Sequence, residues 1–356
     1  MNKRNPFVLL AVLMLVTLLT AGLVFATWQG SGVLGDPPIL PPAPSSQPSA
    51  INLEPRAYLP VTIGEPASQE PWINTQSKNE VRNFYLTEYM ASEGVPSGWN
   101  GDHAGCNAGT TTAAFKTAVL RRINYFRSMA GIPPVTAFKN DYTSKAQKAA
   151  LMMSVNNALD HTPPTSWTCY TADGAEAAGS SNLYLGVYGP SAITGYIQDP
   201  GGGNYFVGHR RWILYPQTQF MGTGDIPPTS YLASNALWVF DLDNMWGPRP
   251  ETREEYVAWP PPGYSPYQVV FDRWSFAYAG ANFANANISM TKNGNPLSLQ
   301  KNSIANGYGE NTLVWEPNDT FGQAPTSDIV YNVTITNVVI NGQSHNFSYQ
   351  VILFKP

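Results

Sequence analysis

Residues 208–216 read GHRRWILYP, and residues 221–224 read MGTG a few positions later. The first stretch predicts a short helix over residues 207–214, which ends at Tyr215-Pro216 because proline cannot continue a helix. The second predicts a strand over residues 220–224. Residues 236–242 begin with the apolar run ALWVF, which is typical of a strand that is buried on both faces and therefore has layers above and below it.

Working upstream, the spacing of apolar residues predicts two longer helices. Residues 110–131 carry apolar side chains every three or four positions and start with three threonines that can cap a helix. A second helix is expected over residues 141–160, and a short one over residues 191–197. Residues 79–246 are therefore expected to form helices around a small sheet.

The most specific blocks in this region are residues 122–134 (RINYFRSMAGIPP), residues 145–151 (KAQKAAL) and the GHRRWILYP and MGTG runs. Together they resemble the CAP superfamily (cysteine-rich secretory proteins, antigen 5 and pathogenesis-related 1 proteins), specifically its bacterial SCP-like branch. The similarity covers about residues 110–243. It implies a CAP-type α–β–α sandwich, an extracellular role and a cleft that carries two histidines and two acidic residues.

The resemblance also selects candidate cleft residues. His161 and His209 match the two histidine positions. Ser181 stands where relatives have a glutamate, so Glu176 is considered as a carboxylate that reaches in from upstream. Asp199, ten residues before His209, is the better candidate for the second acid. The alternative is that the two histidines are ordinary polar residues, Asp199 starts a turn and Glu176 is an exposed loop carboxylate.

The same histidines are the candidate metal ligands. Neutral imidazoles favour zinc or copper, but two nitrogens alone seldom hold either firmly. No cofactor is therefore required, and zinc or another divalent metal at His161 and His209 is a candidate. Arg210 is a further candidate cleft residue. Arg210 and Arg211 point about 100° apart on a helix, so one is expected to brace a carboxylate and the other to meet water.

Two cysteines suggest a disulfide. If the first two helices run roughly antiparallel, Cys106 and Cys169 lie at the same end of the pair, and an exported protein meets an oxidising compartment. The alternative is two separate buried thiols. His103, close to Cys106, lies in a polar loop and is expected to be solvent-exposed, and His345 lies beside a hairpin turn at the surface.

The N-terminal residues suggest export. Residues 1–28 hold Lys3 and Arg4 before a long apolar run, and this pattern is typical of a signal peptide or a transmembrane anchor with the rest of the chain outside the cell. Residues 29–78 are rich in proline and are expected to be an extended linker without chemistry of its own.

The C-terminal third has a different pattern. Residues 247–266 contain two proline clusters and are expected to be a rigid connector. Residues 267–356 hold short alternating runs and two Asn-Gly turns, which predict an all-β, Ig-like sandwich. The expected fold class of the whole chain is α+β.

Composition limits the function classes. The chain has 356 residues, 12% of them charged, and a net charge of −4, which disfavours nucleic acid as a partner. No Gly-x-Ser-x-Gly and no His-Glu-x-x-His motif occurs. The leading hypothesis is a secreted or membrane-anchored CAP-domain protein that binds a lipid, glycan or protein ligand without catalysis. The alternatives are a metal-dependent hydrolase or protease that uses His161 and His209, and an adhesion protein that acts through its C-terminal sandwich.

Overall fold

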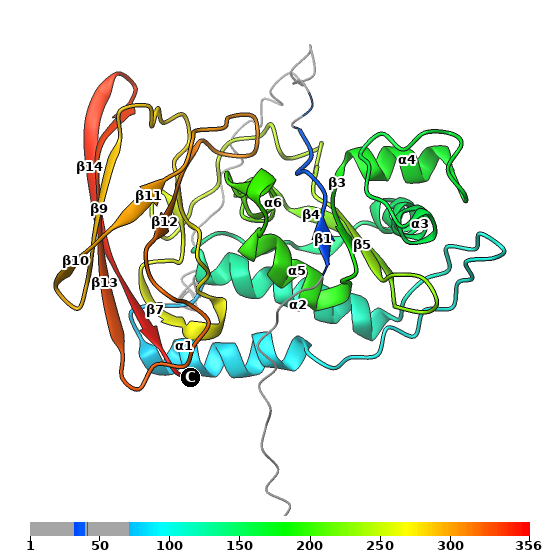
Figure 1. The fold of residues 1–356 in the computed structure, drawn as a ribbon, viewed down its shortest axis with the longest axis horizontal. Helices are drawn as coiled ribbons and strands as arrows, with labels where there is room; N and C mark the ends of the chain where they lie inside the picture. The colour runs from blue at the N-terminus through cyan, green and yellow to red at the C-terminus, as the bar shows by residue number, and fades with distance from the viewer. Residues whose placement is uncertain (1–31, 40, 42–70) are drawn as a thin grey trace, which may run out of the picture.

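The structure is a computed structural model that describes residues 32–39, 41 and 71–356 (Figure 1). The predicted signal peptide or anchor at residues 1–28 lies outside this part of the chain. Within the described ranges, no helix combines the length and the apolar character that crossing a bilayer requires.

The centre of the N-terminal half is a five-stranded sheet with the strand order β1-β3-β5-β4-β2. Its strands are β1 (Val33–Leu34), β2 (Ala137–Phe138), β3 (Ser181–Leu185), β4 (Phe220–Ile226) and β5 (Ser234–Trp238). Every residue of β3 and β5 is buried, as expected of strands that are covered on both faces.

Helices cover both faces of this sheet, which gives the three layers of the predicted α–β–α sandwich (Figure 1). On one side lie α3 (Asn140–Asn156) and α4 (Ala172–Gly179). On the other lie α2 (Ala113–Met129), α5 (Gly189–Gln198) and the short α6 (Gly208–Ile213). A single-turn helix, η3 (Gly202–Asn204), lies between α5 and α6.

Local signals explain most of these boundaries. The side chain of Thr112 accepts a hydrogen bond from the Phe115 amide and caps α2, so the helix predicted over residues 110–131 is confirmed with slightly narrower bounds. The strand predicted over residues 236–242 is wrong at its end, because β5 stops at Trp238. Beyond it, the Asp241 carboxylate accepts hydrogen bonds from the amides of Gln219 and Phe220.

One helical segment was not predicted. Residues 78–92 form α1 (Lys78–Phe84), a π-helical turn η1 (Tyr85–Tyr89) and a 3₁₀ turn η2 (Met90–Ser92). Their buried side chains Val81, Tyr85 and Tyr89 join the main core. The change of helical type alters the spacing of the apolar residues, so no single period is visible in the sequence.

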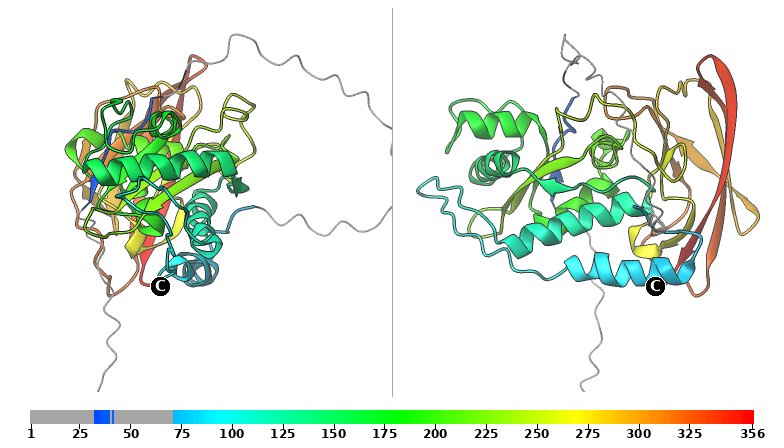
Figure 2. Two further views of the ribbon diagram at one scale, coloured as in Figure 1. Left: turned by 90° about the vertical axis from the view of Figure 1, so that its right-hand side faces the viewer. Right: turned by 180° about the vertical axis from the view of Figure 1, so that it is seen from behind.

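The C-terminal half is a sandwich of two sheets, with strand orders β10-β9-β13-β14-β7 and β11-β12-β8-β6. The strands are β6 (Val257–Trp259), β7 (Gly263–Pro266), β8 (Trp274–Ala277), β9 (Asn287–Lys292), β10 (Asn295–Leu297), β11 (Leu299–Lys301), β12 (Thr312–Pro317), β13 (Ile329–Ile340) and β14 (Gln343–Phe354), with a 3₁₀ turn η4 (Tyr267–Val269) after β7. Figure 2 shows β13 and β14 at the outer side of the molecule. The chain is therefore α+β as predicted, while the Ig-like topology of the sandwich stays a prediction.

The predicted connector is part of the C-terminal sandwich. Residues 247–266 contribute β6 and β7, one to each C-terminal sheet. Trp259 and Phe354 also belong to the same hydrophobic core as helix α2. The two halves of the chain therefore share a core and pack tightly, and the proline clusters flank short strands.

The predicted linker also needs a correction. Residues 29–78 were expected to hold no folded structure, but Val33 and Leu34 form β1, which pairs antiparallel with Leu185 and Tyr184 of β3. The two glycines beside β1 explain why it was missed, since Gly-flanked runs of two apolar residues are too short to predict a strand. We call residues 32–39 the strap.

Close contact between α3 and β4 gives a first test of the fold. A Cβ added to Gly224 would lie 2.1 Å from the backbone of Ala146. We expect Gly224→Ala to lower the free energy of unfolding by about 3 kcal/mol, because α3 must move away from the sheet. Urea unfolding checks this value. Gly202→Ala, where a Cβ would meet no atom within 4 Å, should change it little; equal losses in both variants would contradict this packing.

Candidate functional site

The first element of the site is the buried pair of His209 and Asp199. The Nδ1–H of His209 donates to Asp199 Oδ1 at 2.8 Å, and both side chains are fully buried. The other oxygen, Oδ2, accepts from the backbone amides of His209 at 3.0 Å and Arg210 at 3.4 Å. Asp199 therefore orients the imidazole and also caps the first turn of α6.

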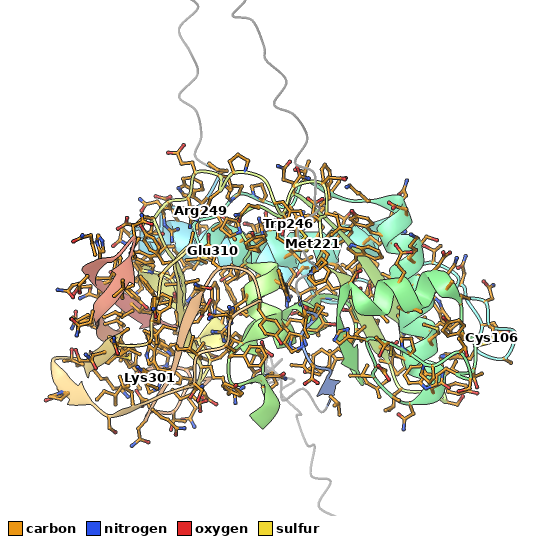
Figure 3. The ribbon with its side chains drawn as sticks, turned by 90° about the horizontal axis from the view of Figure 1, so that it is seen from above. Cys106, Met221, Trp246, Arg249, Lys301 and Glu310 are labelled. Atoms are coloured by element: carbon orange, nitrogen blue, oxygen red, sulfur yellow. A yellow bond between two sulfur atoms is a disulfide. The ribbon has the colours of Figure 1, made fainter. Side chains whose placement is uncertain are left out.

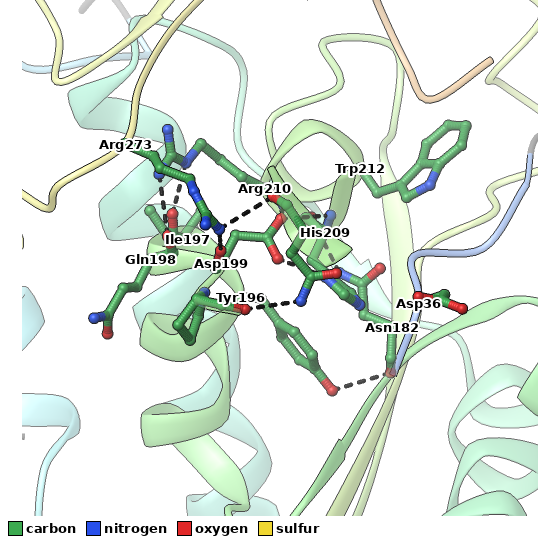
Figure 4. A network of polar contacts seen from close by, with 12 residues as sticks. Asp36, Asn182, Tyr196, Ile197, Gln198, Asp199, His209, Arg210, Trp212 and Arg273 are labelled. Carbon is green, nitrogen blue, oxygen red and sulfur yellow. Dashed lines mark hydrogen bonds and ion pairs between the residues drawn. The ribbon is translucent and has the colours of Figure 1, made fainter. Parts of the chain in front are cut away.

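A buried layer of polar side chains surrounds the imidazole of His209 (Figure 4). The ring of Tyr196 stacks on it with centroids 5.5 Å apart. The hydroxyl of Tyr196 donates to Asn235 Oδ1 at 2.8 Å, and Asn182 Nδ2 donates to the carbonyl of His209 at 3.1 Å. Burial holds the pKa of Tyr196 well above its usual value, so this hydroxyl stays neutral. The Nε2 atom of His209 has no hydrogen-bond partner among the described residues.

His161 lies between the core and the strap. Its Nδ1 donates to the carbonyl of Ala178 at 2.6 Å, and its Nε2 donates to the carbonyl of Asp36. The structure therefore places His161 between α4 and the strap, with one ring nitrogen facing a carbonyl oxygen of each.

The strap contacts His161 and also Gly208, the residue before His209. Asp36 is held by His161, and the next residue, Pro37, packs against Gly208 beside His209: a Cβ on Gly208 would lie 2.2 Å from Pro37 Cγ. The carbonyl of Pro38 accepts from Trp212 Nε1 at 2.7 Å. We call the edge of β3 together with His161, Gly208 and Trp212 the strap site.

The remaining candidate carboxylate and its neighbour lie elsewhere. Glu176 is on α4, its side chain 53% exposed, in an ion pair with Lys145 at 2.9 Å. Ser181 is the first residue of β3 and is fully buried, and its hydroxyl has no hydrogen-bond partner among the described residues. Of the two acidic candidates, the structure thus gives Asp199 the contact with His209.

Arg210 and Arg211 are both buried, which corrects the expectation that one of them meets water. Arg210 donates to the carbonyl of Ile197 at 2.6 Å and to Ser275 Oγ of β8 at 3.0 Å. Arg211 donates to the carbonyls of Ala305 and Glu310. Burial lowers the pKa of Arg210 to about 9 and that of Arg211 to about 10. Both side chains fasten α6 to the C-terminal sandwich, and neither is available to an anionic ligand.

The metal hypothesis can be tested on the donor atoms. No group of three or more His, Cys, Asp or Glu side chains in the described ranges could hold a metal ion. Both nitrogens of His161 face carbonyl oxygens, and both oxygens of Asp199 accept from α6. The donors in this arrangement therefore do not fit a metal ion, so no step of a mechanism is derived through one.

The predicted disulfide is confirmed. Cys106 and Cys169 are bonded, with their Cα atoms 5.1 Å apart and a sequence separation of 63. Figure 3 shows Cys106 at the end of the molecule opposite the C-terminal sandwich. His103, expected to be exposed, is instead buried: its Nε2 contacts Ser154 Oγ at 3.1 Å and its ring stacks on Tyr231. His345 is exposed, as predicted.

Sequence comparison supports the class of protein that this fold suggests. Residues 120–240 match the model of the Cysteine-rich secretory protein family (CAP), a stretch that runs from within α2 to just beyond β5. This part of the chain is therefore a CAP domain, and the family indicates an interaction or ligand-binding module. No curated protein matches the chain as a relative.

The His209–Asp199 pair gives a second prediction. We expect Asp199→Asn to lower the free energy of unfolding by about 2 kcal/mol, because an amide cannot accept from the imidazole and from both α6 amides at once. Urea unfolding measures the change. Asp243→Asn is the control, since that carboxylate is 75% exposed and pairs with Lys139 at the surface. A loss no larger than in this control would show that the pair does not hold α6.

The strap is the element of the candidate site that the sequence analysis missed. Its proline content favoured a linker, and the residues that hold it lie far away in the sequence, at His161, Gly208 and Trp212. One available signal was Gly208 itself. A glycine at the start of a helix is consistent with the close approach of another backbone or ring, and Pro37 makes that approach here.

Proposed function

We propose that this protein works outside the cell as a ligand-binding module, with the strap site as its binding site, and that it catalyses no reaction there. The observation that carries this proposal is the strap itself. An extended segment of polypeptide lies on the site, and His161 and Trp212 donate hydrogen bonds to two of its carbonyls. A site that already holds one extended chain has the shape and the donors to hold a ligand.

The chemistry of the site also favours binding over catalysis. A hydrolase would need a general base or a nucleophile that can reach its substrate. Both ring nitrogens of His161 are occupied by contacts with carbonyl oxygens, and the second imidazole, His209, is fully buried. The role outside the cell is supported by the basic and apolar N-terminal sequence and by the disulfide.

A strap-displaced variant tests the proposal. Pro37 is buried against Gly208, so Pro37→Asp places a charge where the ring packs and should release the strap. We expect the full chain with this substitution to bind at least one of three probes: phosphatidylcholine–phosphatidylglycerol vesicles, chitin oligomers or an extended peptide. Ile39→Asp is the matched control, because Ile39 is 73% exposed. Binding of no probe by the folded Pro37→Asp variant would overturn the proposal.

The competing hydrolase hypothesis needs its own measurement. The full chain is incubated with zinc and casein, and peptide release and bound zinc are measured together. We expect no hydrolysis above the buffer control. Stoichiometric zinc and hydrolysis that are lost together in His161→Ala and His209→Ala would instead establish the metal-dependent enzyme.

A further inference from the structure

We infer that the ligand of the strap site is an extended polypeptide, which adds to the edge of β3 as β1 does, and that the strap covers this site in cis until such a peptide displaces it. This inference rests on the proposed binding function and names its ligand class. The inference is supported by the chemistry of the contacts, the shape of the site and the small number of contacts that hold the strap.

Main-chain atoms of the strap make its polar contacts with the site. Val33 and Leu34 pair with β3, and the Gly35 amide donates to the Leu183 carbonyl at 3.0 Å. The carbonyls of Asp36 and Pro38 accept from His161 and Trp212. Because every polypeptide carries these groups, another extended chain can make the same bonds, which is the principle of strand addition at a sheet edge.

The shape of the site limits which side chains a bound peptide can carry. Only Pro37 and Pro38 of the strap are buried, and Gly208 leaves room for the Pro37 ring. Gly32 is equally restricted, since a Cβ there would lie 2.5 Å from the carbonyl oxygen of Leu185. The site therefore fits a chain with a glycine at the position of Gly32 and prolines beside α6. Proline also costs little entropy to hold in an extended conformation.

The strap is held by few contacts for a permanent strand. Its ladder with β3 is two residues long, and two of its large apolar side chains face solvent, with Val33 62% and Ile39 73% exposed. Strands of globular proteins are usually about five residues long. A segment of the same chain needs little intrinsic affinity, because tethering gives it an effective concentration on the order of millimolar. A free peptide with a higher intrinsic affinity for the site can therefore displace the strap.

Buried groups beneath the strap support a binding role for this place. His209 Nε2 and Asn182 Oδ1 are buried and have no hydrogen-bond partner among the described residues. Figure 4 shows Asn182 and His209 in one network, with Asp36 of the strap at its side. Such groups are rare in folded proteins and raise the free energy of the covered state. A ligand that offers them a donor or an acceptor gains affinity that the strap lacks.

The experiment measures peptide binding by the full chain. The probe is a fluorescein-labelled synthetic peptide with the sequence of residues 32–41, GVLGDPPILP, followed by fluorescence anisotropy. We expect weak binding by the unchanged protein and by Ile39→Asp, and binding at least tenfold tighter by Pro37→Asp. Adding Gly208→Ala to the Pro37→Asp variant should weaken binding at least tenfold, whereas adding Gly202→Ala should not. Circular dichroism and thermal unfolding confirm that each variant is folded.

The outcomes separate this inference from the proposed function. Equal peptide binding by Pro37→Asp and Ile39→Asp, with both folded, would overturn the inference and leave the strap a permanent strand. If Pro37→Asp gains binding to vesicles or chitin oligomers and not to the peptide, the ligand class is wrong while the binding function stands. If the peptide binds as expected but mass spectrometry finds it cleaved, recognition of the main chain is supported and the non-catalytic function is overturned.

Discussion

Replacing Arg127 with methionine is expected to lower the free energy of unfolding by about 4 kcal/mol. The guanidinium is fully buried and donates to five carbonyls, those of Pro133, Ile213, Tyr215, Pro216 and Thr218. Methionine is of similar helix propensity and fills part of the space, but it leaves these carbonyls without donors. Because burial lowers the pKa of Arg127 to about 9, its hydrogen bonds must offset the cost of burying the charge.

Equilibrium unfolding in urea measures this effect, and helix α2 offers its own control. Arg121 lies on the same helix, is 40% exposed and pairs with Glu88 at 3.2 Å. Arg121→Met should cost less than about 1 kcal/mol, as surface ion pairs contribute little. Similar losses for the two variants would mean that Arg127 does not tie α2 to the segment after α6.

Removing the disulfide is the second change with a large expected effect. The bond between Cys106 and Cys169 closes a loop of 63 positions, and the chain-entropy relation assigns about 4 kcal/mol to a loop of that length. We expect the double variant Cys106→Ser/Cys169→Ser to lose about this amount in urea unfolding.

Reduced and alkylated protein provides the matched comparison, since it lacks the bond but keeps the original sequence. The two forms should agree within about 1 kcal/mol if loop closure is the cause. Non-reducing mass spectrometry that finds two free thiols in the native protein would contradict the bond itself. The strap lies on another part of the molecule, so peptide binding by the Pro37→Asp variant should survive the loss of the disulfide.

Some of the fold could be predicted because its signals are local. The three threonines at residues 110–112 and the Gly-Ile-Pro-Pro at residues 131–134 mark the two ends of α2, and GHRRWILYP marks α6. The apolar residues of β5 indicate a strand that is covered on both faces. The disulfide followed from the compartment and from the relative direction of two helices, both of which the sequence suggested.

The site was harder, because contacts between distant residues decide what each side chain does. Asp199 and His209 were matched through the family resemblance, yet nothing local shows that Asp199 also caps α6. Arg210 and Arg211 are buried because the C-terminal sandwich lies against α6. The spacing of residues within a helix does not predict such packing. A family match places residues but does not show which distant elements cover them.

The strap illustrates the same limit most clearly. A proline-rich segment usually lacks a fixed partner, so composition argued for a linker. What fixes residues 32–39 is the edge of β3 together with donors from His161 and Trp212, which are supplied by residues more than a hundred positions away. Only the folded structure shows that the β3 edge, His161 and Trp212 all contact this one segment.

Hydrogen exchange of the strap amides tests the central claim most directly. In the full chain, we predict that the amides of residues 33–35 exchange much faster than those of β4 and β5, through local release of the strap. Gly208→Ala should speed this exchange at least tenfold while the amides of α2 and β4 stay unchanged, and Gly202→Ala should have no effect. Strap amides that exchange as slowly as the core, or that are unaffected by Gly208→Ala, would contradict a displaceable strap over a binding site.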